Sequence, residues 1–280
     1  MEDRLTRLLG DPIADAEDEA FVVFSQSIPS QALGIIDSKT STVEVCVSGR
    51  DLTIHQSPGL LTSDRKSGTT GAVIWRVTPL FAEWLSPTNF LFRHDFLSSH
   101  STVVELGAGV SGVVALTLGP LVRRYLATDQ QYVLKLLKQN IAENTPVTST
   151  KTGRTKHHKN REQHGGDHSS IQTLELDWEL DSVQSLSTVD LVLACDTIYN
   201  ESLIEPFNST CAEICRLRSE SQQEGRTICL VAQQLRSSDV FEMWLKSFQK
   251  QFKTWRIPNE LLTESLRENT GFIIYMGILR

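Results

Sequence analysis

The stretch TVVELGAGVSG at residues 102–112 constrains the fold of this chain more than any other. Residues 102–106 are mostly apolar and β-branched, which favours a buried strand. Glycines then occupy positions 107, 109 and 112, and residues 110–118 are typical of a small-residue helix that ends at Gly119 and Pro120. A strand, a glycine turn and a helix in this order predict a nucleotide-binding corner, where a ligand lies against bare main chain.

The glycine spacing alone also fits a dinucleotide fingerprint, so the neighbouring residues decide which ligand the corner takes. Glu105 stands near the carboxyl end of the predicted strand, beside the turn. Its carboxylate would repel a pyrophosphate and would favour a ligand that has positive groups and no phosphate. S-adenosylmethionine, with an α-ammonium and a sulfonium, is such a ligand. The alternative is that Glu105 is a partly exposed strand-end acid without a ligand.

Composition and charge narrow the class of protein. The 280 residues include 40% hydrophobic and 22% charged side chains, which is ordinary for one large or two small globular domains. The formal net charge of −7 argues against direct nucleic-acid binding and suits a basic partner. We expect no membrane span, no signal peptide and a monomer. Five cysteines without a framework spacing indicate reduced thiols, as in the cytoplasm or the nucleus.

The sequence predicts two parts. Residues 1–70 are expected to form an acidic lead-in and a small β appendage, with a strand at residues 21–24 and a hairpin over residues 43–54. Residues 71–280 are expected to form an α/β domain, interrupted by a disordered insertion at about residues 147–170. The insertion contains four histidines whose spacing matches no defined metal site, so we predict no metal.

One aromatic and one acidic residue, Trp75 and Asp129, flank the glycine corner in the sequence. Trp75 precedes a helix predicted over residues 77–85, and it is either a wall of the ligand cavity or ordinary core. The second predicted strand, residues 124–128, ends at Asp129, twenty positions after Gly109. An acid in that place can accept two hydrogen bonds from a ribose diol. It can also cap the helix predicted at residues 130–143.

Later strands of the predicted sheet also end in polar residues. The strand at residues 171–176 is followed by Asp177 and Trp178, a pair that suits an adenine ring and its amine. The strand at residues 189–195 ends at Asp196, with Tyr199 close behind. Helices are predicted at residues 201–217 and 238–251, and further strands at residues 227–232, 252–257 and 271–279. The acids Glu105, Asp129, Asp177 and Asp196 therefore all fall at strand ends, where open α/β sheets bind ligands.

Several of these motifs together resemble a known family. The segments ELGAG (residues 105–109), LDW (176–178) and ACDTIY (194–199) resemble the motifs of the seven-β-strand protein-lysine methyltransferases, and GAVIW (71–75) resembles that family's upstream tryptophan motif. Within the family, WRVTPLFAEWL (75–85) and CDTIYN (195–200) are most similar to the fungal ribosomal lysine N-methyltransferase 5 group. The resemblance implies a Rossmann-like seven-strand sheet with helices on both faces. It also implies S-adenosylmethionine as donor and a lysine of a large-subunit ribosomal protein as acceptor.

The resemblance also assigns residues to roles. It places around the cofactor Trp75, Gly107, Ala108, Gly109, Asp129, Trp178 and Ala194, to which the strand-end argument adds Glu105 and Asp177. It places Asp196 and Tyr199 at the rim where the acceptor lysine enters, as the catalytic pair. A helix cap is the alternative role for Asp196. A nicotinamide-dependent oxidoreductase and a non-catalytic protein-binding module that keeps the fold remain the alternative functions.

Overall fold

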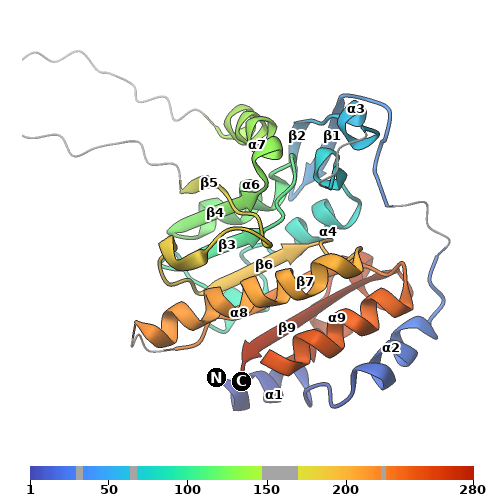
Figure 1. Ribbon diagram of the computed structural model, residues 1–280, viewed down its shortest axis with the longest axis vertical. Helices are drawn as coiled ribbons and strands as arrows, with labels where there is room; N and C mark the ends of the chain where they lie inside the picture. The colour runs from blue at the N-terminus through green and yellow to red at the C-terminus, as the bar shows by residue number, and fades with distance from the viewer. Residues whose placement is uncertain (30–33, 64–67, 147–169, 222–224) are drawn as a thin grey trace, which may run out of the picture.

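A seven-stranded sheet forms the centre of the computed structural model, which describes residues 1–29, 34–63, 68–146, 170–221 and 225–280 (Figure 1). The strand order is β5-β4-β3-β6-β7-β9-β8, and β9 runs antiparallel to both of its neighbours while the other pairs are parallel. The strands are β3 (Thr102–Leu106), β4 (Arg124–Asp129), β5 (Ile171–Glu175), β6 (Leu191–Cys195), β7 (Ile228–Gln234), β8 (Phe252–Arg256) and β9 (Phe272–Leu279).

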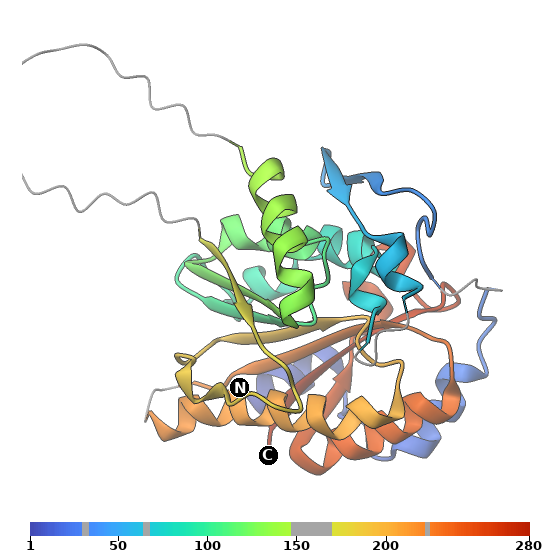
Figure 2. The same cartoon turned by 45° about the horizontal axis from the view of Figure 1, so that its top comes forward.

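Helices cover both faces of this sheet (Figures 1 and 2). One hydrophobic cluster joins the sheet to α4 (Val77–Trp84), α6 (Val113–Leu118) and α7 (Gln131–Asn144). The other joins it to α2 (Ala16–Phe24), α8 (Ile204–Glu220) and α9 (Ser238–Gln251). In the central strand β3, Val103 belongs to the first cluster and Val104 to the second, as expected for a strand buried on both faces. The predicted Rossmann-like fold is therefore confirmed.

The N-terminal region differs in part from the prediction. The predicted hairpin is present as β1 (Thr42–Val47) and β2 (Arg50–His55), which pair in antiparallel register. The strand predicted at residues 21–24 is wrong, because these residues form the last turns of α2. The Asp15 side chain caps that helix by accepting hydrogen bonds from the main-chain N–H groups of Glu17 and Asp18.

The lead-in folds back onto the main sheet. Leu5 and Leu9 of α1 (Glu2–Leu9) lie in the first hydrophobic cluster, and α2 packs against α9. The Ile13 N–H donates to the main-chain oxygen of Thr254 in β8 at 2.8 Å. Residues from both ends of the chain therefore meet at one edge of the sheet, and the division at residue 70 stays a prediction.

Smaller boundary shifts have local causes. Helix α6 begins at Val113 and not at residue 110, because Gly112 takes a left-handed φ of 62° just before it. The helix predicted from residue 201 starts as a short 3-10 turn, η4 (Glu201–Leu203), before α8. Residues 147–169 of the predicted insertion, with its four histidines, lie outside the described residues. Within the described ranges, no helix is long and apolar enough to cross a membrane, and no group of His, Cys, Asp and Glu could hold a metal ion.

Candidate active site

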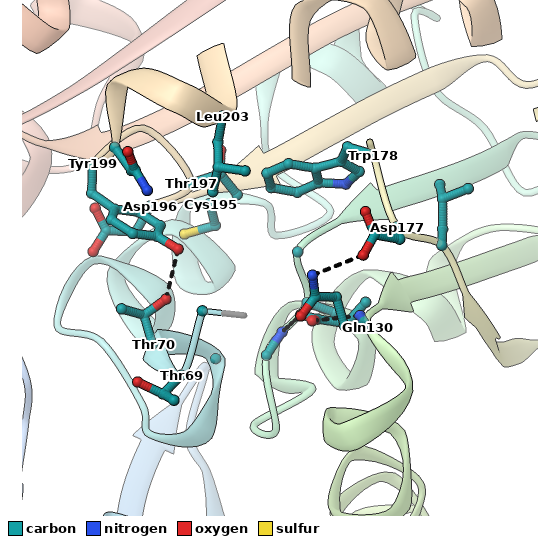
Figure 3. A pocket seen from close by; sticks show the side chains of 18 of the residues that line it. Thr69, Thr70, Gln130, Asp177, Trp178, Cys195, Asp196, Thr197, Tyr199 and Leu203 are labelled. Atoms are coloured by element: carbon teal, nitrogen blue, oxygen red, sulfur yellow. Dashed lines mark hydrogen bonds between the residues drawn. The ribbon is translucent and has the colours of Figure 1, made fainter. Parts of the chain in front are cut away.

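A cavity of about 610 Å³ opens at the carboxyl ends of β3, β4 and β6. Figure 3 shows how the side chains around it converge from these strand ends and from the segment before α4. Every predicted site residue except Ala194 lines it: Trp75, Glu105, Gly107, Ala108, Gly109, Asp129, Asp177, Trp178, Asp196 and Tyr199. Ala194 is 1% exposed and its side chain belongs to the core beneath the cavity, so its role stays a prediction.

The glycine turn leaves no room for a side chain at Gly107. Gly107 has a φ of 70°, and an added Cβ would lie 2.9 Å from Cγ2 of Thr197 and 3.2 Å from Cζ2 of Trp178. A Cβ on Gly109 would lie 3.4 Å from the main-chain oxygen of Gly71, which also accepts a hydrogen bond from the Val110 N–H at 2.8 Å. The turn is therefore held against residues before α4; both space and conformation require glycine at 107, and the φ of 62° favours glycine at 109.

Asp129 ties the glycine turn to the start of α7. Its Oδ2 accepts a hydrogen bond from the Gly109 N–H at 2.8 Å, and its Oδ1 accepts one from the Gln130 N–H at 2.7 Å. Asp129 is half-buried in the cavity wall, and desolvation raises the pKa of its carboxyl to about 6. A carboxylate oxygen accepts more than one hydrogen bond, so a ribose contact is compatible with these two bonds.

Glu105 is the most buried acid of the site. It is 2% exposed, and its Oε2 accepts a hydrogen bond from the Tyr125 hydroxyl at 2.8 Å. Desolvation raises the pKa of Glu105 to about 7, although the Tyr125 hydrogen bond works in the opposite direction. The interpretation of Glu105 as a partly exposed acid is therefore wrong. A cationic group brought close to this buried carboxyl would favour its charged form.

The adenine side of the predicted site is also preassembled. Gln130, which the sequence analysis did not single out, donates from Nε2 to Oδ2 of Asp177 at 3.0 Å (Figure 3). Trp178 meets the ring of Phe207 edge to face, with ring centroids 5.2 Å apart. Gln130 could be found only through its place directly after a strand-end acid. Its partner lies 47 residues away, which no local pattern reveals.

Asp196 is an ion-pair partner and not a helix cap. Both of its carboxylate oxygens accept from the guanidinium of Arg236, each at 2.6 Å, and its side chain is 1% exposed. The cap of the following turn is Asn200, whose Oδ1 accepts from the Ser202 N–H at 3.1 Å. Asp196 lines the large cavity, whereas Arg236 lines a smaller hollow behind it. The pair is neutral as a whole, and Asp196 is its member that lines the large cavity.

Tyr199 and Trp75 are linked through Thr70. The Thr70 hydroxyl donates to the Tyr199 oxygen at 3.0 Å, and the main-chain oxygen of Thr70 accepts from Nε1 of Trp75 at 3.0 Å. The Arg236 guanidinium carbon lies 5.2 Å from the Trp75 ring centroid. Burial raises the pKa of the Tyr199 phenol, so this hydroxyl keeps its proton near neutral pH. Trp75 is half-buried in the cavity wall, as one of its two predicted roles requires.

Thr197 is a further lining residue that the sequence analysis missed. It is 6% exposed, and its Oγ1 has no hydrogen-bond partner in the part of the chain that the structure describes. Buried hydroxyls are normally paired, so this atom is free to bond a ligand in the cavity. Together with the side-chain-free glycine turn and the strand-end acids, it makes the cavity fit a nucleoside ligand with positive groups.

Comparisons with known proteins identify the family of this chain. The profile of the lysine methyltransferase family matches residues 54–250. Ribosomal lysine N-methyltransferase 5 of Zygosaccharomyces rouxii is 35% identical and covers 80% of this chain and 78% of its own length. The protein of the same name from Vanderwaltozyma polyspora is 29% identical, over 88% of this chain and 90% of its own length. Among solved structures, the N-methyltransferase NodS from Bradyrhizobium japonicum, in complex with S-adenosyl-l-homocysteine, aligns with a TM-score of 0.42 and 10% identity over 79% of this chain and 95% of that chain.

The sheet topology and the cavity at its carboxyl edge define a Rossmann-like methyltransferase fold. The chain belongs to the lysine methyltransferase family, whose profile spans most of its length. It is an enzyme that uses S-adenosylmethionine as methyl donor, and the family predicted from the motifs is confirmed. This membership disfavours a nicotinamide-dependent oxidoreductase and a non-catalytic binding module.

Proposed function

We propose that this enzyme methylates the side-chain Nζ atom of a lysine in a large-subunit ribosomal protein. The single observation that carries the acceptor class is the similarity to ribosomal lysine N-methyltransferases over most of both chains. The net charge of −7 supports it, because ribosomal proteins are basic partners. We further propose that the enzyme acts in the cytoplasm, where ribosomes work and where its reduced cysteines are stable.

The proposed cofactor contacts follow from the geometry of the cavity. Asp129 would accept hydrogen bonds from the ribose hydroxyls, Asp177 and Trp178 would hold the adenine, and Glu105 would stabilise the positively charged methionine end. Gly107 and Gly109 let the ligand approach the main chain. When bound, S-adenosylmethionine supplies a methyl carbon activated by a sulfonium, which an amine attacks in line.

The chain's own task is to deliver the lysine as a neutral amine. Removing the proton of a free lysine, with a pKa of about 10.4, costs about 4.6 kcal/mol at pH 7. The negative end of the Asp196–Arg236 pair attracts the ammonium to the rim of the cavity. Tyr199, held by Thr70 and protonated near neutral pH, orients the amine without taking its proton. Burial beside a cation then disfavours the ammonium, and its proton leaves to solvent.

Methyl transfer to purified proteins tests the proposal. The enzyme is incubated with tritiated S-adenosylmethionine and a mixture of large-subunit ribosomal proteins, and mass spectrometry locates the modified residue. We expect the label on a lysine side chain of one ribosomal protein and a strong loss of label with Tyr199→Phe. Binding of S-adenosylmethionine without any labelled ribosomal protein would contradict the proposed acceptor.

A further inference from the structure

Two hollows continue the active site along the same edge of the sheet. The first, of about 40 Å³, lies behind Tyr199, which also lines the large cavity. The second, of about 400 Å³, lies at the ends of β8 and β9. Gln233 and Gln234 of the first hollow pair in register with Ile273 and Phe272 of the second. The two hollows are therefore separated by one strand-to-strand spacing.

The small hollow contains a donor without an acceptor. Gln233 is 2% exposed, and its Nε2 has no hydrogen-bond partner among the residues that the structure describes. The surrounding walls are mostly apolar, formed by Phe24, Ile198, Leu235, Val240 and Phe241. Buried amides are normally bonded, so this donor is available to an acceptor outside the described residues. A main-chain carbonyl of a polypeptide that lies over the hollow would supply one.

The larger hollow is lined by acidic and apolar residues. Its carboxylates come from Asp11, Glu19, Glu260 and Glu268, while Arg256 is the single base that lines it. Glu19 is already engaged, since it accepts from the Tyr275 hydroxyl and lies 3.5 Å from Arg256. The other three carboxylates have no cationic partner within the described ranges. Lysine and arginine side chains match such a surface. Their apolar stems can pack on its apolar residues while their charged ends reach its carboxylates.

The acidic hollow is built from segments outside the residues that match the family. All residues that line the large cavity fall between positions 68 and 203, inside the family match at residues 54–250. All residues that line the acidic hollow fall outside that match, in the lead-in and after β8 begins. Phe24 brings the lead-in to the small hollow as well. The matched region thus holds the large cavity and most of the small hollow, and the acidic hollow lies beyond its two ends.

We propose that the two hollows bind the acceptor protein beside its target lysine. A segment rich in lysine and arginine passes from Tyr199 over Gln233 and places a basic side chain in the acidic hollow. The proposal deepens the proposed function and rests on it, because it describes how the acceptor of that reaction is chosen. Two features indicate this occupant. The three carboxylates of the acidic hollow that lack a cationic partner complement its positive charge, and the Gln233 amide can donate to its main chain.

Charge reversal in the acidic hollow tests the proposal without using activity. The probe is a labelled oligolysine, and its binding to the full chain is measured by fluorescence anisotropy. The double variant Glu260→Lys, Glu268→Lys is expected to raise the dissociation constant about fivefold or more, as two weak exposed ion pairs predict. The matched control is Glu213→Lys, Glu220→Lys, which changes the net charge equally on the exposed side of α8. An equal loss in both variants, or no loss in the first, would overturn the acidic docking site.

A second variant separates docking from structure. Gln233→Met keeps the side-chain volume and removes the amide, so we expect KM for a mixture of large-subunit ribosomal proteins to rise about threefold with kcat unchanged. The melting temperature should rise, since the variant no longer buries an unpaired donor. A change in melting temperature alone would show a merely structural residue and overturn its part in docking. If the wild-type enzyme labels no ribosomal protein, the proposed function fails, while the oligolysine experiment still decides the docking site.

Discussion

Asp196 and Arg236 illustrate how charge is arranged at the scale of single residues. The carboxylate lines the cavity with its side chain 1% exposed, and both of its oxygens accept from the guanidinium, which is 22% exposed. An ion pair of this kind has no net charge, so any attraction of an ammonium depends on the shorter distance to the carboxylate. The sequence predicts the acid from its place at a strand end. It does not predict the partner, which lies 40 residues later at the end of β7.

Substituting Asp196 alone and then Asp196 with Arg236 distinguishes two roles of Asp196: attraction of the acceptor lysine and stabilisation of the fold. Asp196→Asn should remove the ion pair of Arg236 and lower the free energy of unfolding by about 2–3 kcal/mol, somewhat less than for a fully buried pair. Asp196→Asn with Arg236→Gln should recover most of that stability, because no lone charge remains. Methyl transfer to the protein acceptor should stay low in both, measured beside S-adenosylmethionine affinity, which should change little. Recovery of transfer in the double variant would instead make Asp196 a partner needed only for folding.

We expect Glu105 to make the affinity for S-adenosylmethionine depend on pH. The folded protein raises the pKa of Glu105 from 4.5 to about 7, so the stability that its proton provides is complete below pH 4.5 and is lost as the pH rises through 7. A bound cation favours the ionised form. S-adenosylmethionine affinity should therefore rise about fourfold between pH 6.5 and 8, following the fraction of Glu105 that is ionised. Calorimetry should show proton release near pH 7 that is absent in Glu105→Gln. A flat profile in the wild type would place the methionine end elsewhere.

At the scale of elements, local patterns succeed where each element carries its own signal. Helix α9 spans the predicted residues 238–251, because its apolar side and its cap at Ser237 are both local. The strand predicted at residues 21–24 is the end of helix α2. The prediction fails because the apolar run there is short and its hydrophobic residues show no clear helical or strand periodicity. Its identity depends on the Asp15 cap upstream and on packing against α9. Four apolar residues alone do not distinguish a buried strand from the end of a helix.

The glycine turn between β3 and α6 offers a sharp test at this scale. Gly107→Val should abolish S-adenosylmethionine binding in calorimetry, because its side chain would meet Thr197 and Trp178 in a left-handed backbone conformation. Gly49→Val is the matched control. Gly49 also has a positive φ, of 74°, but nothing lies within 4 Å of an added Cβ. That variant should lose about 1–2 kcal/mol of stability through backbone strain and keep its ligand affinity. Equal binding by both variants would remove the turn from the cofactor site.

At the scale of the whole molecule, the position of the N-terminal lead-in against the sheet is the feature that the sequence does not predict. Residues 13 and 254 share a main-chain hydrogen bond, and Glu19 accepts from Tyr275 at 2.7 Å. Contacts between residues so far apart leave no periodic trace in the sequence. The gathering of strand-end acids, by contrast, is predictable, because parallel strands bring their carboxyl ends to one edge whatever the loops between them do. The cavity was therefore largely foreseen, and the two hollows beside it were not.

The last prediction concerns whether the predicted insertion contributes to stability or to cofactor binding. Residues 147–169 connect α7 to β5, and Ser170 at their end is already part of the fold. The Ser170 hydroxyl donates to the main-chain oxygen of Gly119 at 2.9 Å, and the main-chain oxygen of Ser170 accepts from the Tyr125 N–H at 2.7 Å. Replacing residues 147–169 by a short Gly-Ser linker should leave the melting temperature and its rise with S-adenosylmethionine nearly unchanged, since halving a loop alters closure by only about 0.6 kcal/mol. Removing Ser170 as well should lower stability by about 1–2 kcal/mol through the two lost bonds. Loss of cofactor affinity in the first variant would make the insertion part of the site.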